Sequence, residues 1–261
     1  MQVIEPPTER ALSTLYHEGQ LTPPVEVLLL HGFGDTAAGV LPFAATLSLP
    51  PQVAVAALDG GHDLTDLLQA PQRMLSYYPL DALLTKEPGK GGEMIVLDTA
   101  LRRPTRCDLL QTLTERRARY RGVRFILIGL GQGADVLLDS LCSRDTPEAH
   151  KAPHGSMIDM VLGSVLLCPH PRVIDQFRGA STKTTYRALM FMPKEEAAVP
   201  PLDGIPYREL SRAGATVPRA PEDMQVLLTF LAELLSMHQS TTLARMVQEG
   251  QLHPIQHLQK M

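Results

Sequence analysis

The chain has 261 residues, of which 44% are hydrophobic and 20% charged, and its formal net charge is -4. This composition is typical of a globular α/β domain, and the weak acidic charge argues against nucleic acid or an anionic membrane as a partner. No run approaches the roughly 18 apolar residues of a membrane span, and residues 1–20 lack the basic and apolar regions of a signal peptide. The sequence therefore predicts a cytoplasmic protein without a membrane span.

The cysteines are three in number and far apart along the chain. Because that number is odd and the surroundings are mostly apolar or helical, we expect buried free thiols at Cys107, Cys142 and Cys168.

Residues 1–24 are polar and contain two proline pairs, so they are expected to form an N-terminal arm. Short runs of β-branched residues and leucine then predict buried strands, and stretches with apolar residues on one side predict helices. The predicted strands are 25–30, 53–58, 123–129, 160–168, 186–192 and 205–210; the predicted helices are 40–47, 105–120, a helix ending near 143, and 222–235. Irregular loops with short helices are expected over 64–90.

Strands that alternate with helices predict a mostly parallel sheet with helices on both faces. We assign this α/β domain to residues 25–236 and a C-terminal extension to 237–261. The extension has apolar residues at 243, 246, 247, 252, 255 and 258. An exposed apolar face of this kind is typical of a partner contact, but a helix folded back on its own domain would explain it equally well.

The central motif is an apolar run that ends at Gly129-Leu130-Gly131-Gln132-Gly133-Ala134 and continues with helical spacing. The pattern is typical of a strand, a sharp turn and a helix. It fits the dinucleotide motif G-x-G-x-x-G/A, in which backbone lies against a pyrophosphate. It also fits the hydrolase elbow G-x-S-x-G everywhere except at the serine. The dinucleotide motif normally lies near the start of its domain, with a ribose-binding acid about 20 residues later, and a polar loop follows the helix here.

Three motifs in the same order make the chain resemble the acyl-protein thioesterase and phospholipase-carboxylesterase family of α/β-hydrolases, over about residues 25–235. Leu30-His31-Gly32-Phe33-Gly34-Asp35-Thr36 resembles L-H-G-x-G-D-T, Gly129-Leu130-Gly131-Gln132-Gly133 resembles G-F-S-Q-G, and Glu196-Ala197-Ala198-Val199-Pro200 resembles D-x-V-V-P. The resemblance implies an α/β-hydrolase-like fold without a cofactor.

The resemblance also indicates where a catalytic triad would lie. The nucleophile position is Gly131, the acid position is Glu196, and the base position is Ala215. Glycine and alanine can neither attack a carbonyl nor accept a proton, so the family's mechanism cannot operate with these residues. The backbone N–H groups of Phe33 and Gln132 occupy the positions that form the oxyanion hole in the family.

Other candidate sites are weaker. The histidine pairs His150/His154 and His253/His257 lack a cysteine or carboxylate that would complete a metal pattern, so no metal site is predicted. The carboxylate pairs Asp63/Asp66 and Glu195/Glu196 are read as solvated loop residues.

The sequence therefore predicts a catalytically inactive, hydrolase-like pseudoenzyme that is a binding or structural module in a larger protein assembly. Its partners would be other protein subunits, contacted through residues 1–24 and 237–261. The alternative is a serine esterase or thioesterase that uses catalytic groups not recognised in the sequence.

Overall fold

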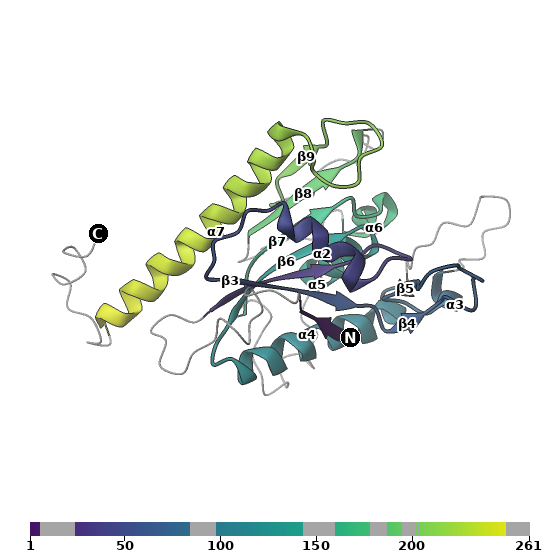
Figure 1. Ribbon diagram of the computed structural model, residues 1–261, viewed down its shortest axis with the longest axis horizontal. Coiled ribbons are helices and arrows are strands. Elements are labelled where there is room, and N and C mark those ends of the chain that lie inside the picture. Colours follow the sequence, from purple (N-terminus) through teal and green to yellow (C-terminus); the bar gives the residue numbers. More distant parts are fainter. Residues whose placement is uncertain are drawn as a thin grey trace.

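A seven-stranded sheet lies at the centre of the molecule, with strands in the order β1-β3-β2-β6-β7-β8-β9 (Figure 1). The computed structural model describes residues 1–5, 24–83, 98–142, 160–177, 187–194, 202 and 204–248. The strands of this sheet are β1 (Gln2–Ile4), β2 (Val25–Leu30), β3 (Val53–Asp59), β6 (Arg124–Leu130), β7 (Val161–Leu167), β8 (Arg187–Met192) and β9 (Tyr207–Glu209). Among the described strands of this sheet, only β1 is antiparallel to its neighbour, so the predicted mostly parallel sheet is confirmed.

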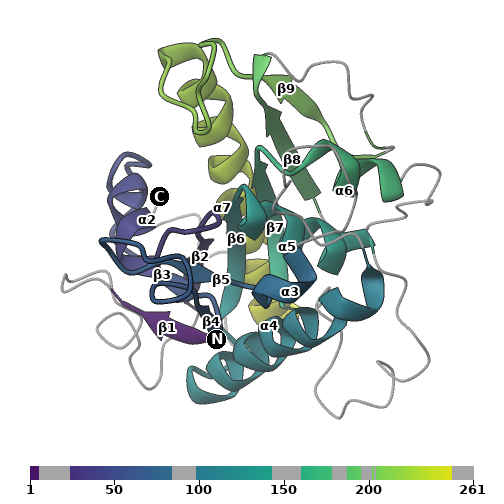
Figure 2. The same cartoon turned by 90° about the vertical axis from the view of Figure 1, so that its right-hand side faces the viewer.

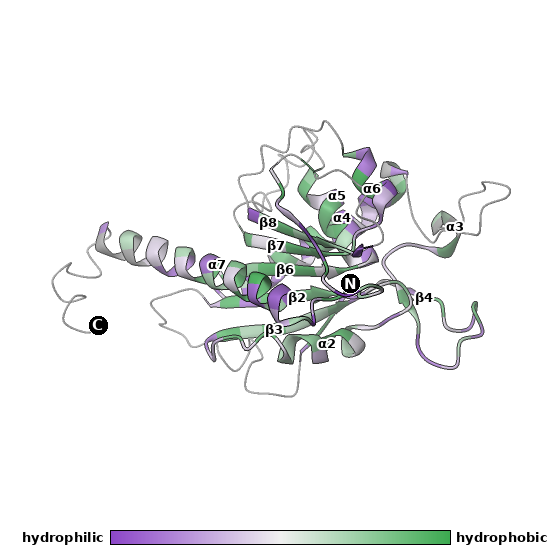
Figure 3. Ribbon diagram, turned by 90° about the horizontal axis from the view of Figure 1, so that it is seen from above, coloured by the Kyte–Doolittle hydropathy of each residue, from purple (hydrophilic) through white to green (hydrophobic). Residues whose placement is uncertain are grey.

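Helices cover both faces of the sheet, as predicted (Figures 2 and 3). They are α2 (Ala37–Ala45), α3 (Leu80–Leu83), α4 (Thr99–Arg119), α5 (Gln132–Cys142), α6 (Pro171–Gln176) and α7 (Pro221–Gln248). Residues of α4, α5 and α6 share one buried apolar cluster, and residues of α2 and α7 share the other. A small hairpin of β4 (His62–Asp63) and β5 (Leu75–Ser76) lies outside the main sheet.

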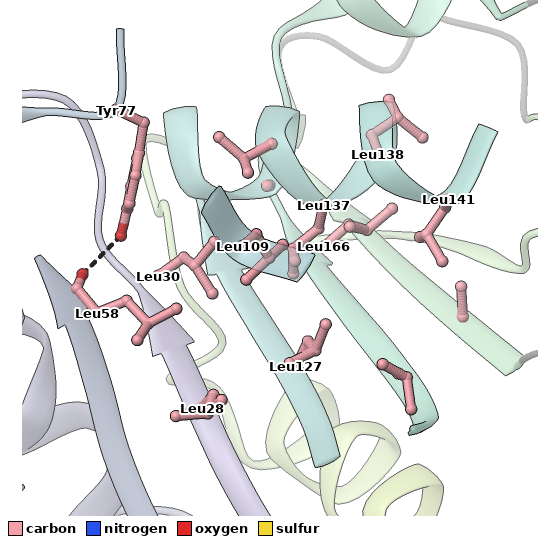
Figure 4. Close-up of a cluster of buried hydrophobic side chains, with 14 of the residues drawn as sticks. Leu28, Leu30, Leu58, Tyr77, Leu109, Leu127, Leu137, Leu138, Leu141 and Leu166 are labelled. Atoms are coloured by element: carbon pink, nitrogen blue, oxygen red, sulfur yellow. Dashed lines mark hydrogen bonds between the residues drawn. The ribbon is translucent and has the colours of Figure 1, made fainter. Parts of the chain in front are cut away.

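The central strands are mostly apolar because both faces are buried. On β2, Leu28 and Leu30 belong to the cluster beneath α4 and α5, whereas Val27 and Leu29 belong to the cluster beneath α2 and α7. Figure 4 shows the first cluster, in which Tyr77 also donates a hydrogen bond from its hydroxyl to the carbonyl oxygen of Leu58, at 2.7 Å.

The N-terminal boundary differs from the prediction, because the first residues of the expected arm pair with β3. Val3 packs on one apolar cluster and Ile4 on the other, so the short strand extends both faces of the sheet. Glu5 then pairs with Arg116 at 3.0 Å. Burial on two faces and this ion pair stabilise a strand too short to give a sequence signal.

The boundary expected at 236/237 lies inside a continuous helix, since α7 runs to Gln248. Leu227, Leu231 and Leu234 bury its first part against the sheet. The second part continues beyond the sheet in Figure 1. Residues 249–261 lie outside the described part of the chain.

Candidate functional site at the carboxyl edge of the sheet

The central glycine turn forms a sharp elbow between β6 and α5. Gly131 has φ +49°, in the left-handed region. Its N–H donates to the carbonyl oxygen of Leu167 at 2.8 Å, and the N–H of Gly133 donates to that of His31 at 3.1 Å. The elbow is therefore bonded to the ends of both neighbouring strands, β7 and β2.

The three glycines of the elbow differ in how much space surrounds them. A Cβ on Gly129 would lie 2.5 Å from the carbonyl carbon of Gly133, and one on Gly133 would lie 2.5 Å from the carbonyl oxygen of Leu30. A Cβ on Gly131 would have the Cα of Gly32 as its nearest neighbour, at 3.8 Å, which is ordinary van der Waals contact. Close packing therefore requires the two outer glycines, whereas the central position has room for a side chain.

The second turn of the site follows β2. Gly34 has φ +77°, and its N–H donates to the carbonyl oxygen of Leu75 at 2.9 Å, which ties the turn to the β4–β5 hairpin. In the described part of the chain, the backbone N–H groups of Phe33 and Gln132 have no hydrogen-bond partner. Two donors thus remain unused in the turns that the family resemblance assigns to an oxyanion hole.

The loop that contains Ala215 reaches the same edge of the sheet. Ala215 is half-buried and packs against the apolar cluster beneath α2 and α7. The next residue, Thr216, accepts a hydrogen bond from the thiol of Cys168 through its carbonyl oxygen, at 3.4 Å. Cys168 directly follows Leu167, the acceptor for the elbow N–H. The structure thus brings the nucleophile and base positions to one edge, while Glu196 lies outside the described residues.

Two histidines in turns bonded to the elbow have structural contacts. The Nδ1 of His31 bonds with the carbonyl oxygen of Gly32 at 2.7 Å, and its Nε2 accepts from the N–H of Gly60 at 2.9 Å. Burial lowers the pKa of His31, which favours the neutral ring. His170 caps α6, where its Nδ1 accepts from the N–H of Arg172 at 3.2 Å.

The remaining candidates from the sequence are not brought together into a site. Asp63 accepts hydrogen bonds from Thr65, which lower the pKa of its carboxyl, and it lies 3.6 Å from Arg73. No group of three or more metal-ligating side chains occurs among the residues that the structure describes. The pairs His150/His154, His253/His257 and Glu195/Glu196 lie outside that part of the chain.

Of the cysteines, Cys107 is exposed and Cys168 half-buried, whereas burial raises the pKa of Cys142 to about 12.

A group of buried charged residues on α4 and α5 was missed in the sequence analysis. Asp135, in the first turn of α5, is fully buried, and its Oδ1 accepts from the backbone N–H of His170 at 2.7 Å. Burial raises the pKa of this carboxyl to about 7. Arg102 on α4 lies 3.3 Å from Asp139 on α5, and both side chains are almost completely buried. The available signal was an acidic residue inside an apolar helix, just before Val136-Leu137-Leu138.

The sheet, its covering helices and the elbow define an α/β-hydrolase fold, and comparison with solved structures agrees. Esterase PE8 is 16% identical, with a TM-score of 0.57 over 90% of this chain and 100% of its own. Acyl-protein thioesterase 2 of Zea mays is 15% identical, with a TM-score of 0.55 over 90% of this chain and 98% of its own. SOBER1 of Arabidopsis thaliana is 16% identical, with a TM-score of 0.52 over 81% of this chain and 99% of its own.

The sequence matches no family model and no curated protein. The similarity is therefore one of fold, and it agrees with the hydrolase interpretation of the glycine turn. Among the described helices, none is both long and apolar enough to cross a membrane.

Proposed function

We propose that this protein is a catalytically inactive hydrolase-like module that serves as a binding or structural subunit of a larger protein assembly. The observation that carries the proposal is the glycine at the elbow. Its neighbours leave ordinary contact distance for a Cβ, so packing does not demand a glycine at position 131. A serine hydroxyl could be accommodated there, and the sequence does not supply one.

The second support is the alanine at position 215. A serine or threonine nucleophile needs a base to take its proton, and an alanine in the base position provides none. Loss of one catalytic group leaves only weak residual catalysis from binding and oxyanion stabilisation, orders of magnitude below a working enzyme. With two positions changed, we expect no hydrolysis above the background rate.

A hydrolase that uses other groups is the alternative. Two observations favour it: the unused N–H groups of Phe33 and Gln132, and the half-buried thiol of Cys168 beside Thr216.

Labelling and turnover measurements distinguish the two functions. The purified protein is treated with a fluorophosphonate, which reacts with activated serines, and with iodoacetamide, which reacts with thiolates. Short-chain esters and thioesters are then offered to untreated protein, and a serine hydrolase with an intact triad serves as the positive control. We expect no fluorophosphonate adduct and no turnover. Turnover abolished by either reagent, with an adduct mapped to one serine or to Cys168, would establish the alternative.

The assembly role is supported by the second part of α7. Figure 1 shows this part of the helix extending beyond the sheet. Met237 is 53% exposed there, so a large apolar side chain on this stretch is accessible to a partner. We assign this stretch to contact with another protein subunit.

A further inference from the structure

A cluster of buried polar side chains lies between α4, α5 and α6, behind the elbow. Arg102 is at its centre, with a side chain that is completely enclosed. Its Nη2 donates to Oε1 of Gln176 at 2.7 Å, its Nε lies 3.3 Å from Oδ1 of Asp139, and its guanidinium carbon lies 5.4 Å from the ring centre of Phe177. The arginine is therefore held on three sides by the protein.

Three N–H groups in this cluster have no hydrogen-bond acceptor among the residues that the structure describes. They are Nη1 and Nε of Arg102, the latter misaligned with Asp139, and Nε2 of Gln132. Proteins pair nearly all of their buried donors with protein or with bound molecules, because an unpaired donor keeps the full cost of desolvation. A cationic donor and an amide donor left unpaired together indicate a missing acceptor.

Contacts through the backbone of Tyr77 bring the two side chains to the same part of the molecule. The N–H of Tyr77 donates to Oε1 of Gln132, and its carbonyl oxygen accepts from Oγ1 of Thr105, both at 2.8 Å. Thr105 and Arg102 are three residues apart on α4, so they share one face of that helix. The next residue, Tyr78, is buried and interacts electrostatically with Arg102. Gln132 and Arg102 therefore both lie beside the Tyr77-Tyr78 segment.

The charges of the cluster determine what kind of acceptor fits. Arg102 and Arg106 both lie beside the carboxylate of Asp139, at 3.3 and 2.9 Å. Asp135, one turn beyond Gln132 on α5, is the other carboxyl here, and its pKa of about 7 leaves it about half protonated at neutral pH. The unpaired atoms of Arg102 and Gln132 are all donors, and one of these side chains is a cation. Such surroundings favour an anion that carries only acceptors.

We propose that this cluster binds a small oxyanion, a carboxylate or inorganic phosphate, through Nη1 of Arg102 and Nε2 of Gln132. The site uses the side chain of Gln132, whereas the proposed function rests on Gly131 and Ala215, so the two proposals can fail independently. Binding would fix α4 against α5, because one anion would be held by a side chain from each helix.

Titration of the wild-type protein tests the proposal directly. Isothermal calorimetry measures Kd for sodium acetate and sodium phosphate, and thermal unfolding is followed in both salts against sodium chloride at equal ionic strength. We expect saturable binding of at least one oxyanion, and a Tm that rises with the logarithm of its concentration beyond the effect of chloride. The acetate and phosphate measurements distinguish a carboxylate site from a phosphate site.

Two isosteric variants assign the binding to this cluster. Gln132→Glu keeps an acceptor for the N–H of Tyr77 but replaces the unused amide donor with a carboxylate oxygen, so Kd should rise about tenfold or more through like-charge repulsion. Asp135→Asn keeps an acceptor for the N–H of His170 and removes a negative charge, so Kd should be unchanged or lower. Circular dichroism confirms that each variant is folded.

Equal affinities for wild type and a folded Gln132→Glu variant would overturn the proposal. So would wild-type titrations without saturable binding of either oxyanion. A crystal structure grown with phosphate and acetate is a further measurement that does not depend on any variant. Density for an oxyanion between Arg102 and Gln132 supports the site, whereas ordered water alone at that position contradicts it.

Discussion

Gly131 combines a left-handed backbone with open space around its Cα. A non-glycine residue in this conformation costs about 1–2 kcal/mol, which an elbow bonded to two strands can sustain. Gly129 is different, because a Cβ there would enter the backbone of α5 at 2.5 Å. The turn can therefore form with or without a nucleophile side chain at position 131, whereas it requires glycine at position 129.

We therefore predict that Gly131→Ser folds, loses about 1–2 kcal/mol of unfolding free energy, and hydrolyses no ester or thioester. Without a base at position 215, the hydroxyl stays protonated and poorly nucleophilic. Urea unfolding and ester turnover are the measurements, and Gly129→Ser is the control, expected to be much less stable. Turnover by Gly131→Ser alone would show that a base from elsewhere reaches the elbow. The double variant Gly131→Ser with Ala215→His tests whether the elbow and the loop around position 215 are placed for catalysis.

Asp135 gives the protein a pH-dependent stability. Its folded-state pKa of about 7 lies above the ordinary value of 3.8. Between these values the folded state binds more protons than the unfolded state, so the free energy of unfolding falls as pH rises through the folded pKa. The loss is about 1.4 kcal/mol per pH unit in that range, and it is complete above about pH 7.

Asp135→Asn should remove this loss, because its Oδ1 can still accept from His170 while the side chain stays neutral. We expect the variant to gain stability relative to wild type as pH rises from about 4 to 8, with a plateau above the folded pKa. Chemical unfolding across this range measures the difference, in buffers free of phosphate and acetate. Asp139→Asn is the contrasting variant, and it should be destabilised at every pH because Arg102 and Arg106 lose their shared carboxylate. A wild type whose stability parallels that of Asp135→Asn would exclude a raised pKa.

One arginine on α4 links the end of β1 to β2. Arg116 donates to Glu5 at 3.0 Å and to the buried Glu26 through both Nε and Nη2. Burial raises the pKa of Glu26, although the arginine opposes this shift. A buried carboxylate left without its cation is costly, whereas a half-exposed pair contributes little.

Arg116→Met should therefore cost about 3–5 kcal/mol of unfolding free energy, while Glu5→Gln should cost about 1 kcal/mol or less. The matched comparison is the double variant Arg116→Met with Glu26→Gln, which leaves no buried charge and should recover part of the loss. Equilibrium unfolding in urea gives all three values. Equal costs for Arg116→Met and Glu5→Gln would show that Glu26 is not stabilised by this arginine.

The sequence predicted the strands well because parallel strands buried on both faces are continuous apolar runs. The expected strand 25–30 coincides with β2, and 53–58 lacks only the last residue of β3. Elements without such a run were missed: β1 has three residues and the β4–β5 hairpin two per strand. The start of α4 was placed too late, at residue 105, whereas Asp98 caps the helix by accepting a hydrogen bond from the N–H of Ala100.

The candidate site was predictable only where its positions are motifs. The elbow and the turn after β2 have fixed spacing, so Gly131, Phe33 and Gln132 could be located from the chain alone. The cluster around Arg102 depends on α4, α5 and α6 meeting in space, and residues so far apart in sequence give no local signal. The Arg102 cluster is therefore formed by long-range packing of helices, which the sequence pattern does not predict.

The hydrolase-like fold does not itself identify a partner surface, but α7 offers a candidate. The first part of α7 covers the sheet through Leu227, Leu231 and Leu234. Further along, Met237 is half exposed and has Arg187 beside its sulfur at 3.2 Å. A partner that binds this stretch would bury the side chain of Met237, so this position tests the proposed contact.

We predict that Met237→Asp releases a partner subunit without unfolding the domain. The free energy of unfolding should change by no more than about 0.5 kcal/mol, because the site is exposed. Gln239→Asp is the matched control: it adds the same charge to the same exposed helix, roughly 200° around the axis. Tagged chains are isolated gently from the native cells, and native mass spectrometry gives the mass and stoichiometry of each complex. Wild type and Gln239→Asp should yield a complex of one defined mass, which Met237→Asp loses. Complexes of equal mass and yield from all three chains would place the interface away from this face of α7, and a wild type found only as a free monomer would contradict the assembly role itself.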